Sequence, residues 1–189
     1  MPGSIIEHPQ GTNEMFYRSV FQRFQRSNNG IVAIEFALVA PVLIFVLMAI
    51  VEVSMMTFAA INLDGAAIDV ARRIRTGQAQ ASGDAMGDFS TAMCSHLGST
   101  LNCGALLYDA RIMTNYGSIT LNTEYDPATG EPIVYGFSAG TSGDIIVVRV
   151  MYWWTINTPM ISIFFETAPG TNKRLLTTTV VFQNEPYES

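Results

Sequence analysis

An uninterrupted apolar segment near the N-terminus constrains this 189-residue chain more than any other feature. Residues 31–51 contain one charged side chain, Glu35, and residues 36–51 contain none. A helix rises about 1.5 Å per residue, so about 20 residues cross the ~30 Å hydrocarbon core of a bilayer. Buried helices of soluble proteins rarely run this long without polar residues. The segment therefore predicts a transmembrane helix, and Pro41 is compatible with it because membrane helices tolerate proline.

The charges on either side of this segment predict its orientation. Arg18, Arg23 and Arg26 precede it, whereas Glu52 follows it and the next basic residue is Arg72. By the positive-inside rule, the N-terminal side lies in the cytoplasm and the C-terminal body is exported. The segment is longer than the apolar region of a signal peptide, and no small-residue cleavage site follows promptly. We therefore expect the helix to remain in the mature protein.

Two cysteines, Cys94 and Cys103, lie nine positions apart in the exported part. This spacing suits a small disulfide loop in an oxidising compartment; the alternative is two unrelated thiols. His96 is close to Cys94, but three candidate ligands from one short loop do not have the spacing of a zinc site. We expect a disulfide and no metal site.

Glu35 is the unusual residue of the apolar segment, because a carboxylate in the bilayer costs roughly 2.5–3.5 kcal/mol on insertion scales. It either lies near the interface and reaches the headgroups or pairs with a cation. Cleavage between Gly30 and Ile31 would create an amine four residues before Glu35, on the same helix face. Within one chain or between neighbours, that amine could neutralise the carboxylate where unpaired charge is unfavourable.

A basic leader, a glycine and an apolar helix with glutamate as its fifth residue form a pattern that resembles type IV pilin-like precursors. The string GIVAIEFALVAPVLIFVLMAIVEVS, residues 30–54, resembles the TadE-like family of pilus-assembly pseudopilins. Two further strings are similar to that family, AAIDVARRIRTGQA at residues 66–79 and VFQNEPYES at residues 181–189.

The resemblance implies a minor pilin or pseudopilin of a tight-adherence, Flp-type pilus, acting in pilus assembly and adhesion. It implies that a prepilin peptidase cuts between Gly30 and Ile31, with Glu35 as part of the processing motif, and that other pilins are partners. The implied location is the bacterial inner membrane with a periplasmic head; the filament and its tip are also compatible. The alternative is an uncleaved single-pass protein whose head binds a ligand or partner.

The rest of the pattern predicts an α+β fold in three parts: a polar leader at 1–30, a long helix at 31–77 and a head at 78–189. Apolar residues recur at helical spacing beyond the membrane segment, and Gly77 is a helix stop. In the head we expect a short helix followed by strands in an antiparallel sheet laid on the outer half of the long helix. These elements are the helix at 84–98 and the strands at 105–118, 143–156 and 173–185.

Two shorter stretches of the head have more than one interpretation. TPMISIFFE, residues 158–166, suits a helix with Thr158 as N-cap and Pro159 at the first position, or an exposed apolar loop that touches the membrane or a partner. Trp153 and Trp154 should point to opposite faces of their strand, with core packing favoured over exposure to a partner.

Catalytic chemistry is not indicated. The sequence contains no Gly-rich phosphate loop, no Gly-x-Ser-x-Gly and no His-Glu-x-x-His. Glu124, Asp126 and Glu131 do not fit an EF-hand loop and indicate a solvated turn. The net charge is −6, and removing a leader of three Arg and two acids, or +1, gives −7, which argues against nucleic acid. We expect no enzyme activity and no cofactor.

Overall fold

The computed structural model describes residues 29–158 and 160–187. The chain divides into two compact units, Met1–Met48 and Ala49–Ser189, and each is described by itself. The predicted leader lies outside the described residues except for its last two positions.

The long helix, α2, runs from Asn29 to Arg75, so it begins and ends two residues earlier than predicted. None of the side chains at 31–51 is buried. Among the described residues, α2 is the one helix long and apolar enough to cross a membrane, and it suggests a membrane-anchored protein. Pro41 lies inside the helix, as the membrane interpretation allows.

The outer half of α2 is apolar on one face, and that face packs into the core of the head. Its buried residues recur every three or four positions, which is the period of one helix face. They are Met56, Ala59, Leu63, Ala66, Ala67, Val70 and Ile74. This part of α2 is therefore held by packing, whereas the apolar side chains at 31–51 are left uncovered.

The end of α2 is closed by the C-terminal segment of the chain. Gly77 has a left-handed φ of 79°, which favours glycine. A Cβ at Gly77 would also lie 2.7 Å from Cγ of the Tyr187 ring. The backbone N–H of Glu185 donates to the carbonyl of Arg75 at 2.9 Å, and their side chains form an ion pair at 3.0 Å. The two ends of the head are therefore joined at this point.

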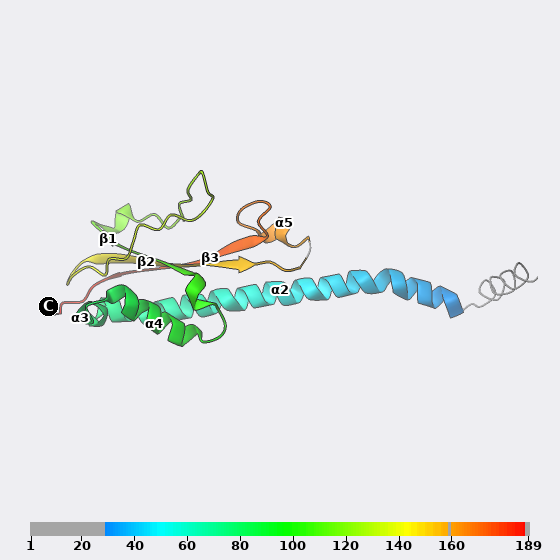
Figure 1. Cartoon of the computed structure of the whole chain (residues 1–189), viewed down its shortest axis with the longest axis horizontal. Helices are drawn as coiled ribbons and strands as arrows, with labels where there is room; N and C mark the ends of the chain where they lie inside the picture. Colours follow the sequence, from blue (N-terminus) through cyan, green and yellow to red (C-terminus); the bar gives the residue numbers. More distant parts are fainter. Residues whose placement is uncertain (1–28, 159, 188–189) are drawn as a thin grey trace, which may run out of the picture. The chain divides into compact units, whose positions relative to one another are not determined.

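Three antiparallel strands in the order β1-β2-β3 form the sheet, which confirms the α+β prediction. The strands are β1 (Leu106–Met113), β2 (Ile145–Thr155) and β3 (Lys173–Gln183). Alternate residues of each strand, such as Tyr108 and Val148, join the core with α2. Figure 1 shows the outer half of α2 on one side of the sheet and the connection between β1 and β2 on the other.

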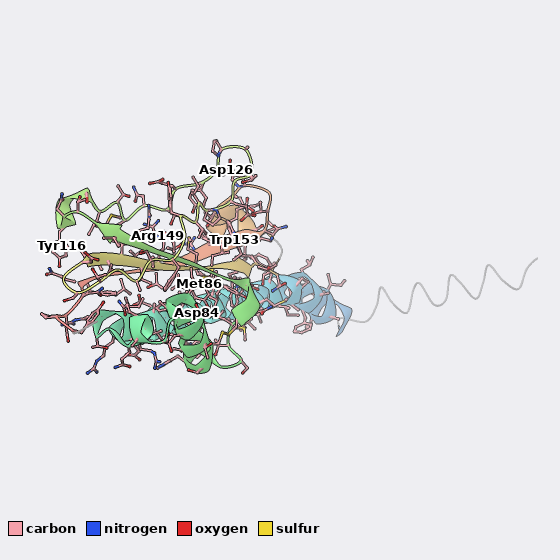
Figure 2. All side chains as sticks on the ribbon, turned by 60° about the vertical axis from the view of Figure 1, so that its left-hand side comes forward. Asp84, Met86, Tyr116, Asp126, Arg149 and Trp153 are labelled. Atoms are coloured by element: carbon pink, nitrogen blue, oxygen red, sulfur yellow. A yellow bond between two sulfur atoms is a disulfide. The ribbon has the colours of Figure 1, made fainter. Side chains whose placement is uncertain are left out.

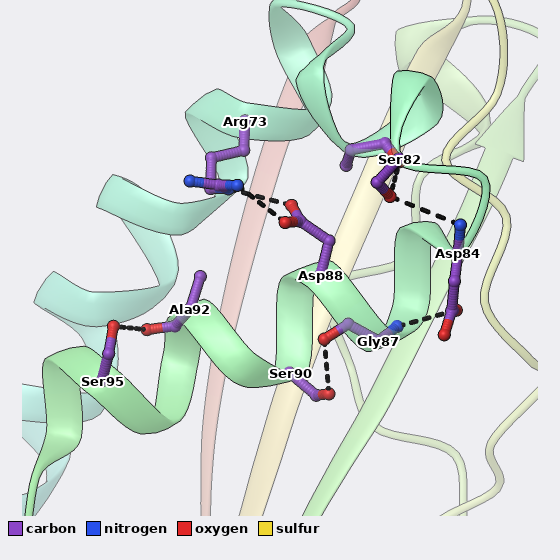
Figure 3. A network of polar contacts seen from close by, with 9 residues as sticks. Arg73, Ser82, Asp84, Gly87, Asp88, Ser90, Ala92 and Ser95 are labelled. Carbon is purple, nitrogen blue, oxygen red and sulfur yellow. Dashed lines mark hydrogen bonds and ion pairs between the residues drawn. The ribbon is translucent and has the colours of Figure 1, made fainter.

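Two short helices follow α2. α4 (Ala85–Leu97) agrees with the predicted helix and ends at Gly98. Its N-cap is Asp84, whose carboxylate accepts from the Gly87 N–H at 2.9 Å (Figure 3). Arg73 of α2 donates to both carboxylate oxygens of Asp88, from Nε at 2.9 Å and from NH2 at 2.7 Å (Figure 3). Between α2 and α4 lies a one-turn helix, α3 (Gln78–Ala81).

The structure joins Cys94, near the end of α4, to Cys103 in a disulfide, with the two Cα atoms 5.6 Å apart. Cys103 begins the 3-10 turn η1 (Cys103–Ala105), which leads directly into β1. The disulfide therefore ties the end of α4 to the start of the sheet.

The connection between β2 and β3 differs from the helix predicted to begin at Thr158. The helix found there, α5, covers only Ser162–Phe165, and its N-cap is Ile161. The Thr158 hydroxyl donates to Glu52 of α2, and Pro159 lies outside the described residues. The capping prediction was wrong, because α5 begins only at Ser162 and Thr158 is therefore not at its N-cap position.

Replacing both disulfide cysteines, Cys94→Ser with Cys103→Ser, is expected to lower the free energy of unfolding by about 2–3 kcal/mol, since a short closed loop is lost from the unfolded chain. Guanidinium unfolding of the full chain in detergent, followed by tryptophan fluorescence, measures the change. Dithiothreitol should lower the free energy of unfolding of the unmodified chain by a similar amount and leave that of the double variant unchanged. A reductant effect of equal size on both proteins would contradict this account.

Candidate processing and assembly site

The predicted processing residues occupy the first two turns of α2. Gly30 is half-buried, whereas Ile31 and Glu35 are exposed. Ile31 and Glu35 lie four positions apart in the continuous helix, so their side chains share a face. An amine created at Ile31 would therefore lie one turn from the carboxylate.

Gly30 has no structural reason to be glycine within the described residues. A Cβ at this position would meet nothing within 4 Å, and its φ lies outside the left-handed region. Glycine inside a helix is less favourable than alanine by about 1 kcal/mol. The packing of the described residues therefore does not require glycine at position 30.

A second glycine of α2, Gly65, has the same property, because a Cβ there would also meet nothing within 4 Å. It lies on an exposed face with Phe58, Ile61 and Ile68, at spacings of three and four residues. The three apolar side chains are each more exposed than buried. This face points away from the buried face that carries Leu63, so α2 has an uncovered apolar face beyond the membrane segment as well.

Glu52, the residue directly after the apolar segment, fixes the sheet to α2. Trp154 Nε1 donates to one carboxylate oxygen at 3.2 Å, and Thr158 Oγ1 donates to the other at 3.2 Å. Further along, Thr178 Oγ1 of β3 donates to Asp64 Oδ1 at 2.6 Å. Together with the contact between Arg75 and Glu185, these bonds place β3 alongside the outer half of α2.

The two tryptophans point to opposite faces, as predicted. Trp154 belongs to the core face and bonds Glu52. Trp153 lies on the other face, where its Nε1 donates to Glu131 Oε2 at 2.9 Å. Each half-buried indole thus has a carboxylate partner, and Trp153 holds the connection between β1 and β2 against the sheet.

A buried charged cluster lies on the same outer face of the sheet. Asp109 and Arg149 oppose each other across β1 and β2 and are 0% and 1% exposed. Asp109 Oδ1 accepts from the backbone N–H of Tyr135 at 3.1 Å. Arg111 Nε lies 3.1 Å from Asp109 Oδ2, which is within ion-pair distance. The Nε–H does not form a hydrogen bond with that oxygen. The guanidinium of Arg149 donates to the carbonyl of Thr120 at 3.0 Å.

The charges of this cluster act on each other. Burial and the neighbouring Arg111 lower the pKa of Arg149. The hydrogen bond to Glu124 raises the pKa of Tyr135, whose ring also lies 4.3 Å beneath the Arg111 guanidinium carbon. The cluster fastens the β1–β2 connection over the sheet. In the described part of the chain, no three His, Cys, Asp or Glu side chains gather in a way that could hold a metal ion.

The sequence reasoning did not single out Glu52, Asp109 or Arg149 as structural residues. One signal was present: Arg149 is the only charged residue in the eleven-residue strand β2. A lone charge inside an apolar strand indicates a buried polar partner on one face. The partner itself, the segment after β1, has no periodic pattern from which its position could be inferred.

Replacing Asp109 by Asn is expected to lower the free energy of unfolding by on the order of 3 kcal/mol, since Arg111 and Arg149 would lose their buried counter-charge. Denaturant unfolding of the full chain in detergent measures it. The matched control is Asp69→Asn, whose side chain is 68% exposed and whose effect should stay within about 0.5 kcal/mol. Equal effects of the two substitutions would show that the cluster does not stabilise the head.

Comparison with known proteins locates one part of the chain in a family. No curated protein and no solved structure matches the chain. The model of the family described as TadE-like protein matches residues 30–72. The match begins at Gly30 and covers the apolar segment, Glu35 and most of the outer half of α2, in agreement with the resemblance found in the sequence. The matched part of the long helix, residues 30–72, is therefore similar to the TadE-like family.

Proposed function

We propose that this chain is the precursor of a minor pilin or pseudopilin, cut between Gly30 and Ile31 by a prepilin peptidase and then assembled through α2. The TadE-like match suggests a role in the tight-adherence pilus. Processing, pilus assembly and adhesion are the proposed refinements of that role. The protein acts as a structural and assembly component, with no catalytic step of its own.

The observation that carries this proposal is the uncovered apolar surface of α2. From Ile31 to Val51 the helix buries no side chain against the described head. Beyond the membrane segment the surface continues as the face with Phe58, Ile61 and Ile68. Outside a bilayer, such a continuous apolar surface is unfavourable for a monomer. Packing on other pilin helices would cover it.

The two glycines of α2 support the same function. Neither Gly30 nor Gly65 is required by the packing of the described residues. At Gly30 a bare backbone lets a peptidase approach the scissile bond. At Gly65 it lets a neighbouring helix come close to the backbone on the exposed face, as small residues do between membrane helices.

Glu35 has two proposed partners in this scheme, the new amine of its own Ile31 and the amine of a neighbouring subunit. Either pairing removes the penalty of an isolated carboxylate in a low-dielectric setting. Only the second sets the register of one helix against another. The proposed location is the inner membrane, with the N-terminus in the cytoplasm and the head in the periplasm, in line with Arg18, Arg23 and Arg26 on the N-terminal side.

Cleavage is tested by the N-terminal residue and intact mass of the protein in membranes of its native host, with and without the prepilin peptidase. We expect a chain that starts at Ile31 only when the peptidase is present. Gly30→Leu should remain uncut, because the added side chain blocks the scissile backbone, yet fold normally, because that side chain points into open space. An intact N-terminus in both strains would favour an uncleaved protein with a binding head.

Glu35→Gln should be cut as efficiently as the unmodified chain but fail to assemble, because the amide keeps the shape of the side chain and loses its charge. Crosslinking of membranes, followed by detection of pilin-containing complexes, measures assembly separately from cleavage. Asp126→Asn, which removes a carboxylate of the β1–β2 connection while its amide oxygen can still accept from the Ala128 N–H, is the matched control and should assemble normally. Normal assembly of Glu35→Gln would rule out the pairing of Glu35 with an amine.

A further inference from the structure

The connection between β2 and β3 exposes large apolar side chains at one end of the head. Met160, Ile163 and Phe164 are 66%, 71% and 80% exposed, and Phe164 has the highest value among large apolar residues in the described part of the chain. Their neighbours Ile161 and Ser162 are buried, so α5 is packed on the head and presents one side outward. This exposure is a property of a folded element and needs a partner to explain it.

The position of α5 identifies that partner. Thr158 bonds Glu52, the first residue after the apolar segment. Phe165, the last residue of α5, lines a shared hollow with Val53 and Met56 of α2. The element therefore lies beside the first turns of α2 that follow the apolar segment.

Those turns correspond to the headgroup layer of a membrane spanned by residues 31–51. Headgroups add about 5–7 Å on each side of the hydrocarbon core, since the whole bilayer measures about 40–45 Å. At about 1.5 Å per residue this layer covers roughly four residues of a helix that emerges along the normal. The layer thus reaches the level of Val53 and Met56, where α5 is packed.

Basic residues accompany the apolar ones at this end of the head. Lys173, the only lysine of the sequence, is exposed at the start of β3, and Arg174 follows it. Arg174 donates from its NH1 to the carbonyl of Phe165 at 3.0 Å, so the basic pair is attached to α5. The same segment contains one carboxylate, Glu166, which accepts from the backbone N–H groups of Gly170 and Asn172, so residues 160–174 carry a net charge of +1 in a chain of net charge −6. A net positive segment next to exposed apolar side chains is the combination that binds anionic membrane surfaces.

We propose that residues 160–174 form a second membrane contact, in which Ile163 and Phe164 enter the boundary between headgroups and acyl chains while Lys173 and Arg174 face anionic headgroups. The inference rests on the proposed membrane anchoring of α2. It adds to the attachment through one helix a second point that holds the head against the bilayer surface.

The test places one nitroxide label at a time on the full chain in nanodiscs that contain phosphatidylglycerol. The two cysteines of the sequence are joined to each other, so an introduced cysteine is the single free thiol. Ile163→Cys reports on α5. Tyr116→Cys is the matched control, an exposed apolar residue at the opposite end of the sheet from Trp153 (Figure 2). Leu43→Cys reports on the apolar segment.

Collision rates with oxygen and with a water-soluble nickel chelate then give the depth of each label. We expect the oxygen-to-nickel ratio at position 163 to shift from the value at 116 toward the value at 43. Lys173→Glu, or nanodiscs of phosphatidylcholine alone, should reduce that shift, since the electrostatic attraction is lost.

Three outcomes would overturn the proposal. A label at 163 as aqueous as the label at 116, with position 43 in hydrocarbon, leaves the anchor intact and removes the second contact. A label at 163 shielded from both reagents shows that protein, such as another copy of the chain, covers α5. An aqueous label at 43 removes the membrane anchor itself, and with it both the second contact and the proposed function.

Discussion

The head is organised by the packing of one face of α2 against one face of the sheet. The two parts of α2 differ in composition. Residues 31–51 are almost entirely apolar, whereas beyond Glu52 the helix has one buried apolar face and one exposed apolar face. The first composition has no counterpart in the described head, so it is available to lipid or to other helices. The second gives the sheet a surface on which alternate strand residues such as Val148 can be buried. Every other contact of the head refines the placement set by this packing.

Polar contacts set the register of the sheet on both faces. On the helix side, Glu52 and Asp64 each accept hydrogen bonds from the β2–β3 hairpin and its connection, so the sheet cannot slide along α2 without breaking them. On the outer side, buried Asp109 and Arg149 bind the backbone of the β1–β2 connection, whose one helical element is the 3-10 turn η2 (Tyr116–Ser118). Apolar burial alone would leave either contact free to shift, because apolar packing is not directional.

The sequence was sufficient for the parts of the fold that follow from local composition and spacing. The apolar segment was predicted from its length and lack of charge, the end of the long helix from Gly77, and the strand at 143–156 from its β-branched and aromatic residues. Helical spacing of apolar residues predicted that the long helix continues beyond the membrane segment. The prediction failed at Thr158, which is not the N-cap of α5 and donates to Glu52, a partner more than a hundred positions away. The burial of Asp109 was not predicted either, because it depends on a loop that carries no pattern. Such contacts are decided by tertiary structure and cannot be read from neighbouring residues.

The closure of α2 by the C-terminal segment has a consequence for how the protein is made. The Glu185 N–H binds the Arg75 carbonyl, and the Tyr187 ring occupies the space next to Gly77. Both partners follow about 110 positions later in the chain. During synthesis the end of α2 is therefore made long before the residues that cover it. The sheet is completed late as well, because β3 directly precedes those residues. A partly synthesised head lacks both β3 and the cover over the end of α2, so its folding can be completed only after Tyr187 has been made.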